Sequence, residues 1–309
     1  MKLGMVGLGR MGGNMAERLR QAGHEVIGYD RDPTVSEATT LADLVDKLGA
    51  SPRVVWVMVP SGTPTDATIT ELLGIMDRGD LIVDGGNSNW RDSQRHGEEA
   101  AAHGIGFVDA GVSGGVWGLQ EGYCLMVGGS TADVEMIKPA LDALAPVDGL
   151  AHVGPVGAGH FTKMVHNGIE YGLMQAYAEG YELLTAADID IDSDAAFKVW
   201  RQGSVVRSWL LDLLCLAIES DPGLTGFAGR ADDSGEGRWT VNEGVRLAVP
   251  LPVISAALFA RFASRQDVSP AMKVISALRS QFGGHAEQAI DRRPAEALNS
   301  EEVGQVRPG

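Results

Sequence analysis

A glycine-rich turn near the start of the chain constrains the fold more than any other feature of the sequence. The turn separates an expected strand, Lys2–Val6, from an amphipathic helix, Met11–Ala22. It consists of Gly7, Leu8, Gly9, Arg10, Met11 and Gly12. In this spacing the first glycine turns tightly, the second lets a pyrophosphate approach the backbone, and the third lets the helix pack closely on the strand. Because backbone amides at the helix start face the phosphates, the pattern predicts a dinucleotide site.

An acidic residue follows the second expected strand, Glu25–Tyr29. Asp30 lies near the position, about 20 residues past the turn, where a carboxylate accepts hydrogen bonds from the adenosine ribose. This carboxylate would repel a 2′-phosphate, although Arg31 beside it offsets part of the repulsion. We therefore expect NAD as the cofactor, with NADP less favoured. The same cofactor site is expected to include Val59, Pro60 and Asn87.

Residues 1–154 alternate short β-rich runs with amphipathic stretches, a pattern typical of βαβ units that bury a parallel sheet under helices. The expected strands are Lys2–Val6, Glu25–Tyr29, Val54–Val59, Leu81–Asp84, Gly106–Ala110 and Cys124–Val127. The expected helices are Met11–Ala22, Leu41–Leu48, Asp66–Met76, Asp92–His103 and Ala132–Leu144. The pattern predicts a doubly wound, Rossmann-type α/β domain.

Residues 155–309 show helical periodicity and few β-branched alternating runs, so we expect an all-helical second domain. Two domains also agree with the length of 309 residues. The expected helices are His160–Ala187, Ala195–Gln202, Ser208–Glu219, Thr240–Ala248, Val253–Arg265 and Pro270–Gln281. A loop rich in Gly, Asp and Ser is expected between Asp221 and Gly237.

The composition excludes several classes of function. A formal net charge of -16 disfavours binding to nucleic acid, and an anionic substrate would need local cations to overcome it. No apolar run approaches the ~18 residues that span a bilayer, and the chain opens without room for a signal sequence. We therefore expect a cytoplasmic protein. Cys124 and Cys215 lack metal-ligand or redox spacing, so we expect two buried thiols and no metal.

Polar residues recur along one face of the expected helix His160–Ala187. They are Lys163, His166, Asn167, Glu170 and Tyr171. The flanking residues are mostly apolar or glycine, and a buried face of this kind is costly unless it lines a site. Seven residues separate the lysine from the glutamate, about 10 Å along a helix. This pair could supply a base at one end of a sugar-sized substrate and an acid at the other.

Two glycine-rich loops follow expected strands at the carboxyl edge of the sheet, where α/β proteins bind ligands. One is Asp84–Ser88, and it contains Asn87. The other contains Ser113, Gly114 and Gly115. The small residues let the backbone approach a ligand, while the amide and hydroxyl offer hydrogen bonds. Because both loops lie at the ends of successive strands, they favour a ligand-binding site over two tight turns with no binding role.

The segment Lys163–Tyr171, together with the Asp84–Ser88 loop, resembles the decarboxylating 6-phosphogluconate dehydrogenases in their short, NAD-preferring bacterial form. The resemblance covers nearly the whole chain. It implies oxidative decarboxylation of 6-phosphogluconate to ribulose 5-phosphate, with Lys163 as general base and Glu170 as general acid. His166 and Asn167 belong to the same catalytic group. The residues implied to contact substrate are Asn87, Ser113, Gly114, Gly115, His166, Asn167 and Tyr171.

The resemblance extends to two basic segments nearer the C-terminus. Arg261 matches a phosphate-binding arginine, while Arg279 and His285 match a tail motif that reaches the partner subunit's site. A homodimer or homotetramer is thus implied. One departure concerns Ser234 and Glu236, which stand where longer relatives carry a substrate-binding lysine and threonine, so those two roles are not transferred.

Two other functions stay open at this point. Non-decarboxylating 3-hydroxyacid dehydrogenases of the hydroxyisobutyrate type share the glycine turn, the Ser-Gly-Gly segment and a catalytic lysine, but they would release no carbon dioxide. A dinucleotide-sensing protein without catalysis could use the helical half only to dimerise. The presence of both Lys163 and Glu170 argues against that second alternative.

Overall fold

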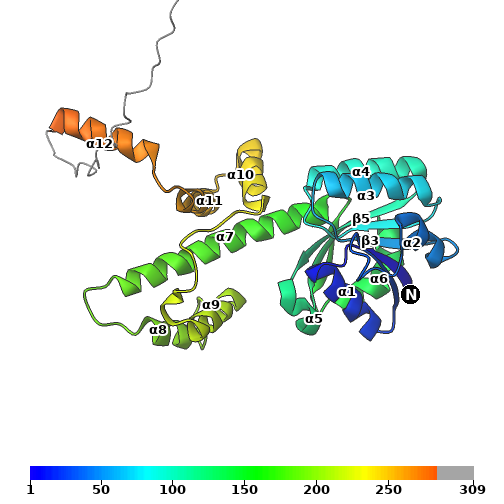
Figure 1. Ribbon diagram of the computed structural model, residues 1–309, viewed down its shortest axis with the longest axis horizontal. Coiled ribbons are helices and arrows are strands. Elements are labelled where there is room, and N and C mark those ends of the chain that lie inside the picture. The colour runs from blue at the N-terminus through cyan, green and yellow to red at the C-terminus, as the bar shows by residue number, and fades with distance from the viewer. Residues whose placement is uncertain (284–309) are drawn as a thin grey trace, which may run out of the picture.

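The structure is a computed structural model that describes residues 1–283. A sheet-based half and a helical half are joined by one long helix, α7, which extends out of the sheet domain (Figure 1). The strands are β1 (Lys2–Val6), β2 (Glu25–Tyr29), β3 (Val54–Val57), β4 (Leu81–Asp84), β5 (Gly106–Ser113), β6 (Cys124–Gly129) and β7 (Leu150–Gly154). They form one sheet in the order β2-β1-β3-β4-β5-β6-β7.

Helices cover both faces of this sheet, which confirms the predicted Rossmann-type fold. They are α1 (Arg10–Gln21), α2 (Leu41–Leu48), α3 (Thr63–Ile75), α4 (Trp90–His103), the short α5 (Gly118–Glu121) and α6 (Thr131–Leu144). Side chains of α1 and α6 share one core cluster with the sheet. Side chains of α2, α3 and α4 share the cluster on the opposite face. Crossover helices on both faces place the carboxyl ends of β1, β3 and β4 at one open edge.

The last two strands differ from the prediction of a parallel sheet. β6 runs antiparallel to β5. The segment between them, Gly114–Tyr123, is shorter than the dozen or more residues that a parallel crossover needs, so the chain turns back instead. β7 was not predicted, because this edge strand is largely exposed and lacks alternating hydrophobic residues. The edge nearest the second half is therefore built partly by a returning strand.

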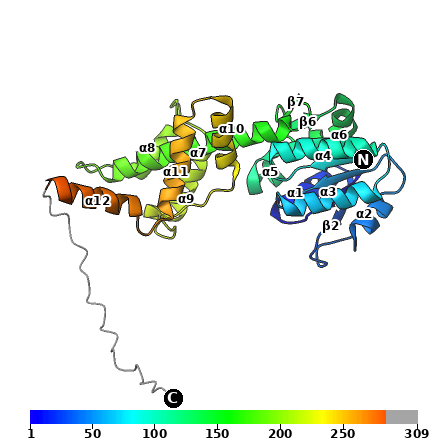
Figure 2. The same cartoon turned by 90° about the horizontal axis from the view of Figure 1, so that it is seen from above.

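Beyond β7 the described chain contains only helical elements and loops. They include α7 (Ala158–Thr185), α8 (Ser193–Trp200), α9 (Trp209–Ser220), α10 (Glu236–Leu247), α11 (Pro252–Ser264) and α12 (Pro270–Gly283). Figure 1 and Figure 2 show α8 to α11 grouped along α7, while α12 extends beyond α11. The predicted helices are confirmed with shifted ends, the largest at α10, which begins four residues before the expected Thr240.

Two further observations bear on the composition. Cys215 is buried as expected, but the expectation of a buried Cys124 is wrong, because this thiol at the start of β6 is exposed. Within residues 1–283, no helix is both long and apolar enough to cross a membrane.

Candidate active site

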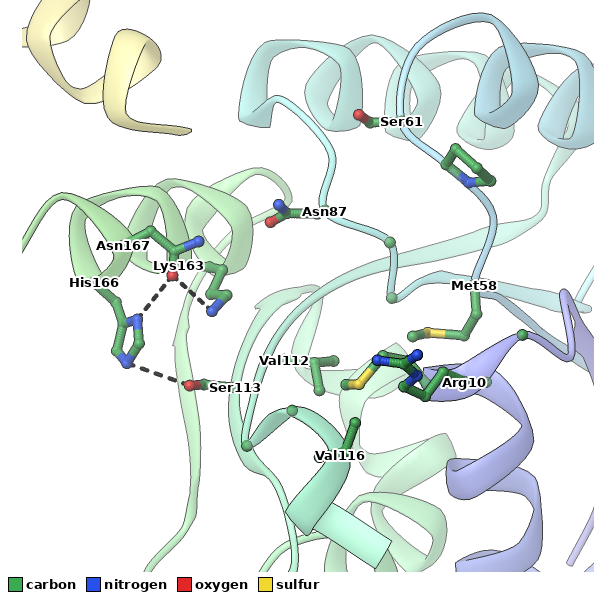
Figure 3. Close-up of a pocket in the computed structure, with 18 of the residues that line it drawn as sticks. Arg10, Met58, Ser61, Asn87, Val112, Ser113, Val116, Lys163, His166 and Asn167 are labelled. Carbon is green, nitrogen blue, oxygen red and sulfur yellow. Dashed lines mark hydrogen bonds between the residues drawn. The ribbon is translucent and has the colours of Figure 1, made fainter. Parts of the chain in front are cut away.

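A cleft of about 1670 Å³ joins the glycine turn to the polar face of α7. Its walls come from the carboxyl edge of the sheet, the loop after β5, α7 and the first turns of α9. Figure 3 shows Arg10 and Met58 on the sheet side, facing Lys163, His166 and Asn167 on α7. The structure therefore brings the predicted cofactor turn and the predicted catalytic helix into one site.

The glycine turn has the geometry that a pyrophosphate requires. A Cβ at Gly12 would lie 2.0 Å from the carbonyl oxygen of Gly7, so only glycine lets α1 start this close to the strand. A Cβ at Gly9, the residue that caps α1, would have no atom within 4 Å, which leaves open space above the backbone. The first backbone amides of α1 have no side-chain cap and can receive an anion. These residues fit a bound dinucleotide.

Asp30 lines the cleft at the end of β2, but its carboxylate also organises the protein. Oδ2 accepts a hydrogen bond of 2.6 Å from the backbone amide of Leu8, and Oδ1 accepts one of 2.9 Å from the amide of Asp32. Leu8 itself faces the core and is absent from the cleft wall, so it takes part through its backbone. The other predicted cofactor residues that line the cleft are Gly7, Gly9, Arg10, Met11, Gly12, Val59, Pro60 and Asn87.

The N-terminal end of α7 is fixed against the sheet. The Asp109 carboxylate, on β5, accepts hydrogen bonds from the backbone amides of Gly157 at 2.7 Å and His160 at 2.8 Å. A Cβ at Gly111 would lie 2.5 Å from the Cβ of Lys163, so α7 crosses β5 in direct contact at the predicted catalytic lysine. The position of this lysine relative to the cofactor turn is thus set by the direct packing of α7 on β5.

Lys163, His166 and Asn167 form a hydrogen-bonded group on the cleft wall (Figure 3). The Lys163 ammonium donates to Oδ1 of Asn167 at 2.7 Å. Nδ1 of His166 lies 3.0 Å from the same oxygen, and its Nε2 lies 3.4 Å from the hydroxyl of Ser113. These contacts link the predicted catalytic helix to the end of β5.

Burial lowers the pKa of the Lys163 ammonium below its ordinary value, since desolvation penalises the charged form. The negative charges of Glu170 and Glu236 oppose this effect. A lysine tuned in this way can exchange a proton with a substrate closer to neutral pH than a surface lysine can. The site therefore contains an amine suited to general base catalysis.

Glu170 lies two turns further along α7 and also lines the cleft. Its carboxylate is 3.9 Å from Nδ1 of His166, and its side chain is 37 % exposed. A carboxyl group at this mouth of the cleft can exchange protons with solvent and with a substrate.

The two glycine-rich loops lie where the sequence predicted them. Asn87 follows β4 and lines the cleft between the cofactor turn and α7 (Figure 3). Ser113, the last residue of β5, lines the cleft together with Gly114 and Gly115, which follow the strand. Together with Asn167 they offer hydrogen-bonding groups on both sides of a bound ligand.

Tyr171 and Arg261 lie away from the wall of this cleft. Tyr171 is 4 % exposed and packs against α11, while its hydroxyl accepts a hydrogen bond of 3.0 Å from the backbone amide of Ser234. The Arg261 guanidinium stacks 3.5 Å from the centre of the Tyr171 ring. Five polar residues were predicted to share one face of α7. Four of them line the cleft, whereas Tyr171 is not in the cleft wall and stacks with Arg261 instead. Arg279 lies on α12, and His285 lies outside the described residues.

Two parts of the site were missed by sequence reasoning. Glu236 is 2 % exposed, and its Oε1 accepts a hydrogen bond of 3.1 Å from Nδ2 of Asn167. Nothing in the loop composition around this residue signalled burial. Trp209 and Leu213 of α9 add an apolar wall to the cleft, although the sequence had predicted only a helix there.

Comparison with known families accounts for both halves of the chain. Residues 2–156 match the NAD binding domain of 6-phosphogluconate dehydrogenase. Residues 159–290 match the 6-phosphogluconate dehydrogenase C-terminal domain. The division between the two matches falls where β7 ends and α7 begins.

Individual relatives agree with this assignment. The chain is 42% identical over 299 residues to the NAD(+)-dependent, decarboxylating 6-phosphogluconate dehydrogenase of Haloferax volcanii, covering 92% of this chain and 98% of the relative. The 6-phosphogluconate dehydrogenase of Plasmodium falciparum, solved with its cofactor NADP+ and with its substrate, superposes with a TM-score of 0.75 at 27% identity, covering 97% of this chain and 68% of that one.

A Mycobacterium tuberculosis 3-hydroxyisobutyrate dehydrogenase superposes with a TM-score of 0.69 at 25% identity, covering 90% of this chain and 99% of that one. The fold is therefore shared with a neighbouring class of dehydrogenases, while both family matches and the Haloferax relative carry the narrower description. The chain belongs to the short, decarboxylating 6-phosphogluconate dehydrogenases, a family of NAD(P)-dependent oxidoreductases.

Proposed function

We propose that this protein converts 6-phospho-D-gluconate to D-ribulose 5-phosphate and carbon dioxide, with NAD as the preferred oxidant. The single observation that carries the proposal is the position of Lys163, a largely buried amine held by Asn167 at 2.7 Å, on the cleft wall opposite the glycine turn. A base beside a nicotinamide site is what oxidation of a hydroxyl group requires.

The residues divide the reaction between them. Lys163, in its neutral form, removes the proton from the hydroxyl on the carbon β to the carboxylate. A bound nicotinamide would supply the acceptor for the hydride on that carbon. The resulting β-keto acid loses carbon dioxide when its new carbonyl is polarised, and the protonated Lys163 donates the hydrogen bond that polarises it. Glu170 then delivers a proton to the terminal carbon of the enediol, which gives ribulose 5-phosphate.

Polar groups on both sides of the cleft would hold the sugar acid. Ser113, His166 and Asn167 are linked by hydrogen bonds and face the same space as Asn87 (Figure 3). Gly114 and Gly115 have no side chains, so their backbone polar groups form this part of the cleft wall. We assign these six residues to substrate binding, because they surround the proposed base on the side of the cofactor turn.

The phosphate would require a cation, since the whole chain is strongly acidic. We assign it to Arg261 and Tyr171, whose stacked side chains join α11 to α7. Arg261 also donates a hydrogen bond of 3.1 Å to the backbone carbonyl of Asp232. A shift of the 231–235 segment would let this arginine turn toward a phosphate.

Asp30 supports NAD as the preferred cofactor. Its carboxylate lines the cleft and is held in place by the amides of Leu8 and Asp32. A negative charge fixed at this position disfavours the 2′-phosphate of NADP.

We also propose that the protein acts as a dimer or larger assembly. The outer helices expose apolar side chains, among them Val253 and Phe259 on α11 and Met272, Val274 and Leu278 on α12. Such a surface is costly in water and is typical of an interface between subunits. Arg279 belongs to the same helix and would reach the partner's site, together with His285 from the segment beyond.

The decisive experiment follows NADH absorbance with 6-phosphogluconate, together with the carbon dioxide released. We expect NADH and carbon dioxide in equal amounts. NADH without carbon dioxide would indicate a hydroxyacid dehydrogenase of the hydroxyisobutyrate type. A protein that binds NAD but turns over neither 6-phosphogluconate nor 3-hydroxyisobutyrate would be a sensor, and the proposal would be wrong.

A further inference from the structure

Glu236 is a buried carboxylate beside the proposed base, and the mechanism above gives it no role. It lies in the first turn of α10, with 2 % of its surface exposed. Its Oε1 accepts a hydrogen bond of 3.1 Å from Asn167, and its Oε2 has no hydrogen-bond partner among the described residues. A carboxylate buried with half of its hydrogen bonds unmade is costly. The helix N-terminus favours the negative charge and offsets part of that cost.

The packing of α10 on α7 also rests on contacts that do not involve this carboxylate. The hydroxyl of Thr240 donates a hydrogen bond of 2.9 Å to the backbone carbonyl of Met164. A Cβ at Gly237 would lie 2.5 Å from the ring of Tyr171, and a Cβ at Gly168 would lie 2.7 Å from Thr240, so the two helices are in close contact at both glycines. An uncharged side chain of the same size would fill the space of Glu236 equally well.

The carboxylate does determine the direction of the hydrogen bonds around Lys163. A carboxylate only accepts hydrogen bonds, so Asn167 must turn its NH₂ group toward Glu236. Oδ1 of Asn167 then faces Lys163 at 2.7 Å and Nδ1 of His166 at 3.0 Å, and both must donate to it. His166 therefore carries its proton on Nδ1, and its Nε2 is left to accept from the hydroxyl of Ser113.

We propose that Glu236 is a positioning residue for the reaction, acting on Lys163 and His166 through Asn167. Its carboxylate fixes which end of the Asn167 amide faces the base, and its negative charge faces the amine from α10. The inference rests on the proposed role of Lys163 as the base. It goes further by assigning the orientation of that base, and the tautomer of His166, to a side chain that lies outside the cleft wall.

The charge of Glu236 is one of several that act on the amine. Glu170 and His166 face Lys163 from α7 itself, Glu236 faces it from α10, and Cys124 faces it from β6. Among these, Glu170 and Glu236 carry the full negative charges that raise the pKa of Lys163 against the effect of burial. Removing the charge of Glu236 should therefore lower the pKa of Lys163 further.

The test compares the Glu236→Gln and Glu236→Asp variants with the wild-type protein. Glutamine fills the same space but has no charge and can present either end of its amide to Asn167. We expect the lower pH midpoint of kcat/KM to fall by about one unit, the small end of the shift that the loss of a nearby opposite charge produces. We also expect kcat to fall about tenfold, because losing a hydrogen bond to a charged group costs a free energy that corresponds to about a tenfold change. Aspartate keeps the charge, so its midpoint should stay within about 0.3 units of wild type while kcat falls.

A matched control is available on the same helix. Glu243 is also a buried carboxylate of α10, but it pairs with Arg91 and Arg246 and not with the residues around Lys163. Glu243→Gln should therefore leave the pH midpoint unchanged. Thermal unfolding of all three variants checks that each is folded. A midpoint that moves equally in Glu236→Gln and Glu243→Gln would overturn the proposal.

A second measurement needs no substrate. The chain has six lysines, so reductive ¹³C-methylation followed by NMR titration can report the Lys163 amine separately, with Lys163→Arg to assign its signal. We expect this signal to titrate about one unit lower in Glu236→Gln. A shift here, in a protein that is inactive toward 6-phosphogluconate, would refute the proposed function and retain this inference. An unshifted signal in a protein that is active toward 6-phosphogluconate would refute this inference and leave the proposed function standing.

Discussion

Replacing Asp30 separates two roles that its carboxylate plays at the cofactor site. Oδ2 accepts from the amide of Leu8 at 2.6 Å and holds the glycine turn, while the charge opposes a 2′-phosphate. Asp30→Ala removes both the hydrogen bonds and the charge. Asp30→Asn removes the charge but keeps one acceptor oxygen for the turn. The two substitutions should therefore affect NAD and NADP differently.

The size of the effect follows from the hydrogen bonds. A backbone amide that loses a charged acceptor costs about 1.5–3 kcal/mol, which is roughly a 10- to 100-fold change in an equilibrium constant. In Asp30→Ala the turn must be ordered when the cofactor binds, so the Kd of NAD should rise by about that factor. Binding of NADP must order the turn as well, but the repulsion between Asp30 and its 2′-phosphate is gone, so the Kd of NADP should change less. In Asp30→Asn the relief dominates, and NADP affinity should improve.

The assay measures kcat/KM for both cofactors at saturating 6-phosphogluconate, with Kd values from quenching of tryptophan fluorescence. The ratio of NAD to NADP efficiencies should fall in both variants, because the cost of the lost hydrogen bonds is common to both cofactors and cancels in the ratio, whereas only NADP gains from the lost repulsion. An equal loss for NAD and NADP in Asp30→Ala, together with an unchanged ratio in Asp30→Asn, would show that Asp30 only supports the turn and does not select the cofactor.

Three further predictions concern the base, the acid and the stability of the helical half. Lys163→Ala should abolish NADH formation and leave the Kd of NAD within about twofold, because the lysine contacts substrate rather than the glycine turn; wild-type turnover in this variant would remove Lys163 as the base. Glu170→Gln should slow ribulose 5-phosphate formation by about 100-fold, the lower range for general acid catalysis, and an unaltered rate would exclude Glu170 as the acid. Hydrogen bonds from Arg238, opposed by burial and supported by Arg265, hold the pKa of Asp233 at about 2. A depressed carboxyl pKa contributes stability above its unfolded value and loses it as pH falls, so Asp233→Asn should cost about 1–2 kcal/mol at pH 7 and almost nothing near pH 2. Urea unfolding at pH 7, 4 and 2.5 checks this, and a cost independent of pH would contradict it.

Much of the fold could be predicted because its signals are local. The glycine turn, the strand ends and the helix Leu41–Leu48 are each written in a short stretch of sequence, and α2 has those bounds. β7 and the reversal of β6 could not be predicted from periodicity. The direction of a strand depends on the length and packing of the connection before it, and an exposed edge strand has no buried face to mark it.

The site divides in the same way. Lys163, His166, Asn167 and Glu170 are close in sequence, so helical spacing placed them on one wall of the cleft. Tyr171 follows directly on Glu170, and the same spacing put it on that face, but contacts with α11 turn it into a separate core. The burial of Glu236 arises from the crossing of α10 over α7, which sequence spacing cannot give.

The contact between Gly111 and Lys163 limits how this enzyme can be recombined with its relatives. The lysine belongs to the helical segment, yet the depth at which it sits is decided by a missing side chain in the nucleotide-binding segment. A chimera that joined this helical half to another Rossmann domain with any larger residue at that strand position would push the base outward. In such a chimera the helical half must keep its own β5. A graft that replaces the nucleotide-binding segment to change the cofactor should therefore end before β5.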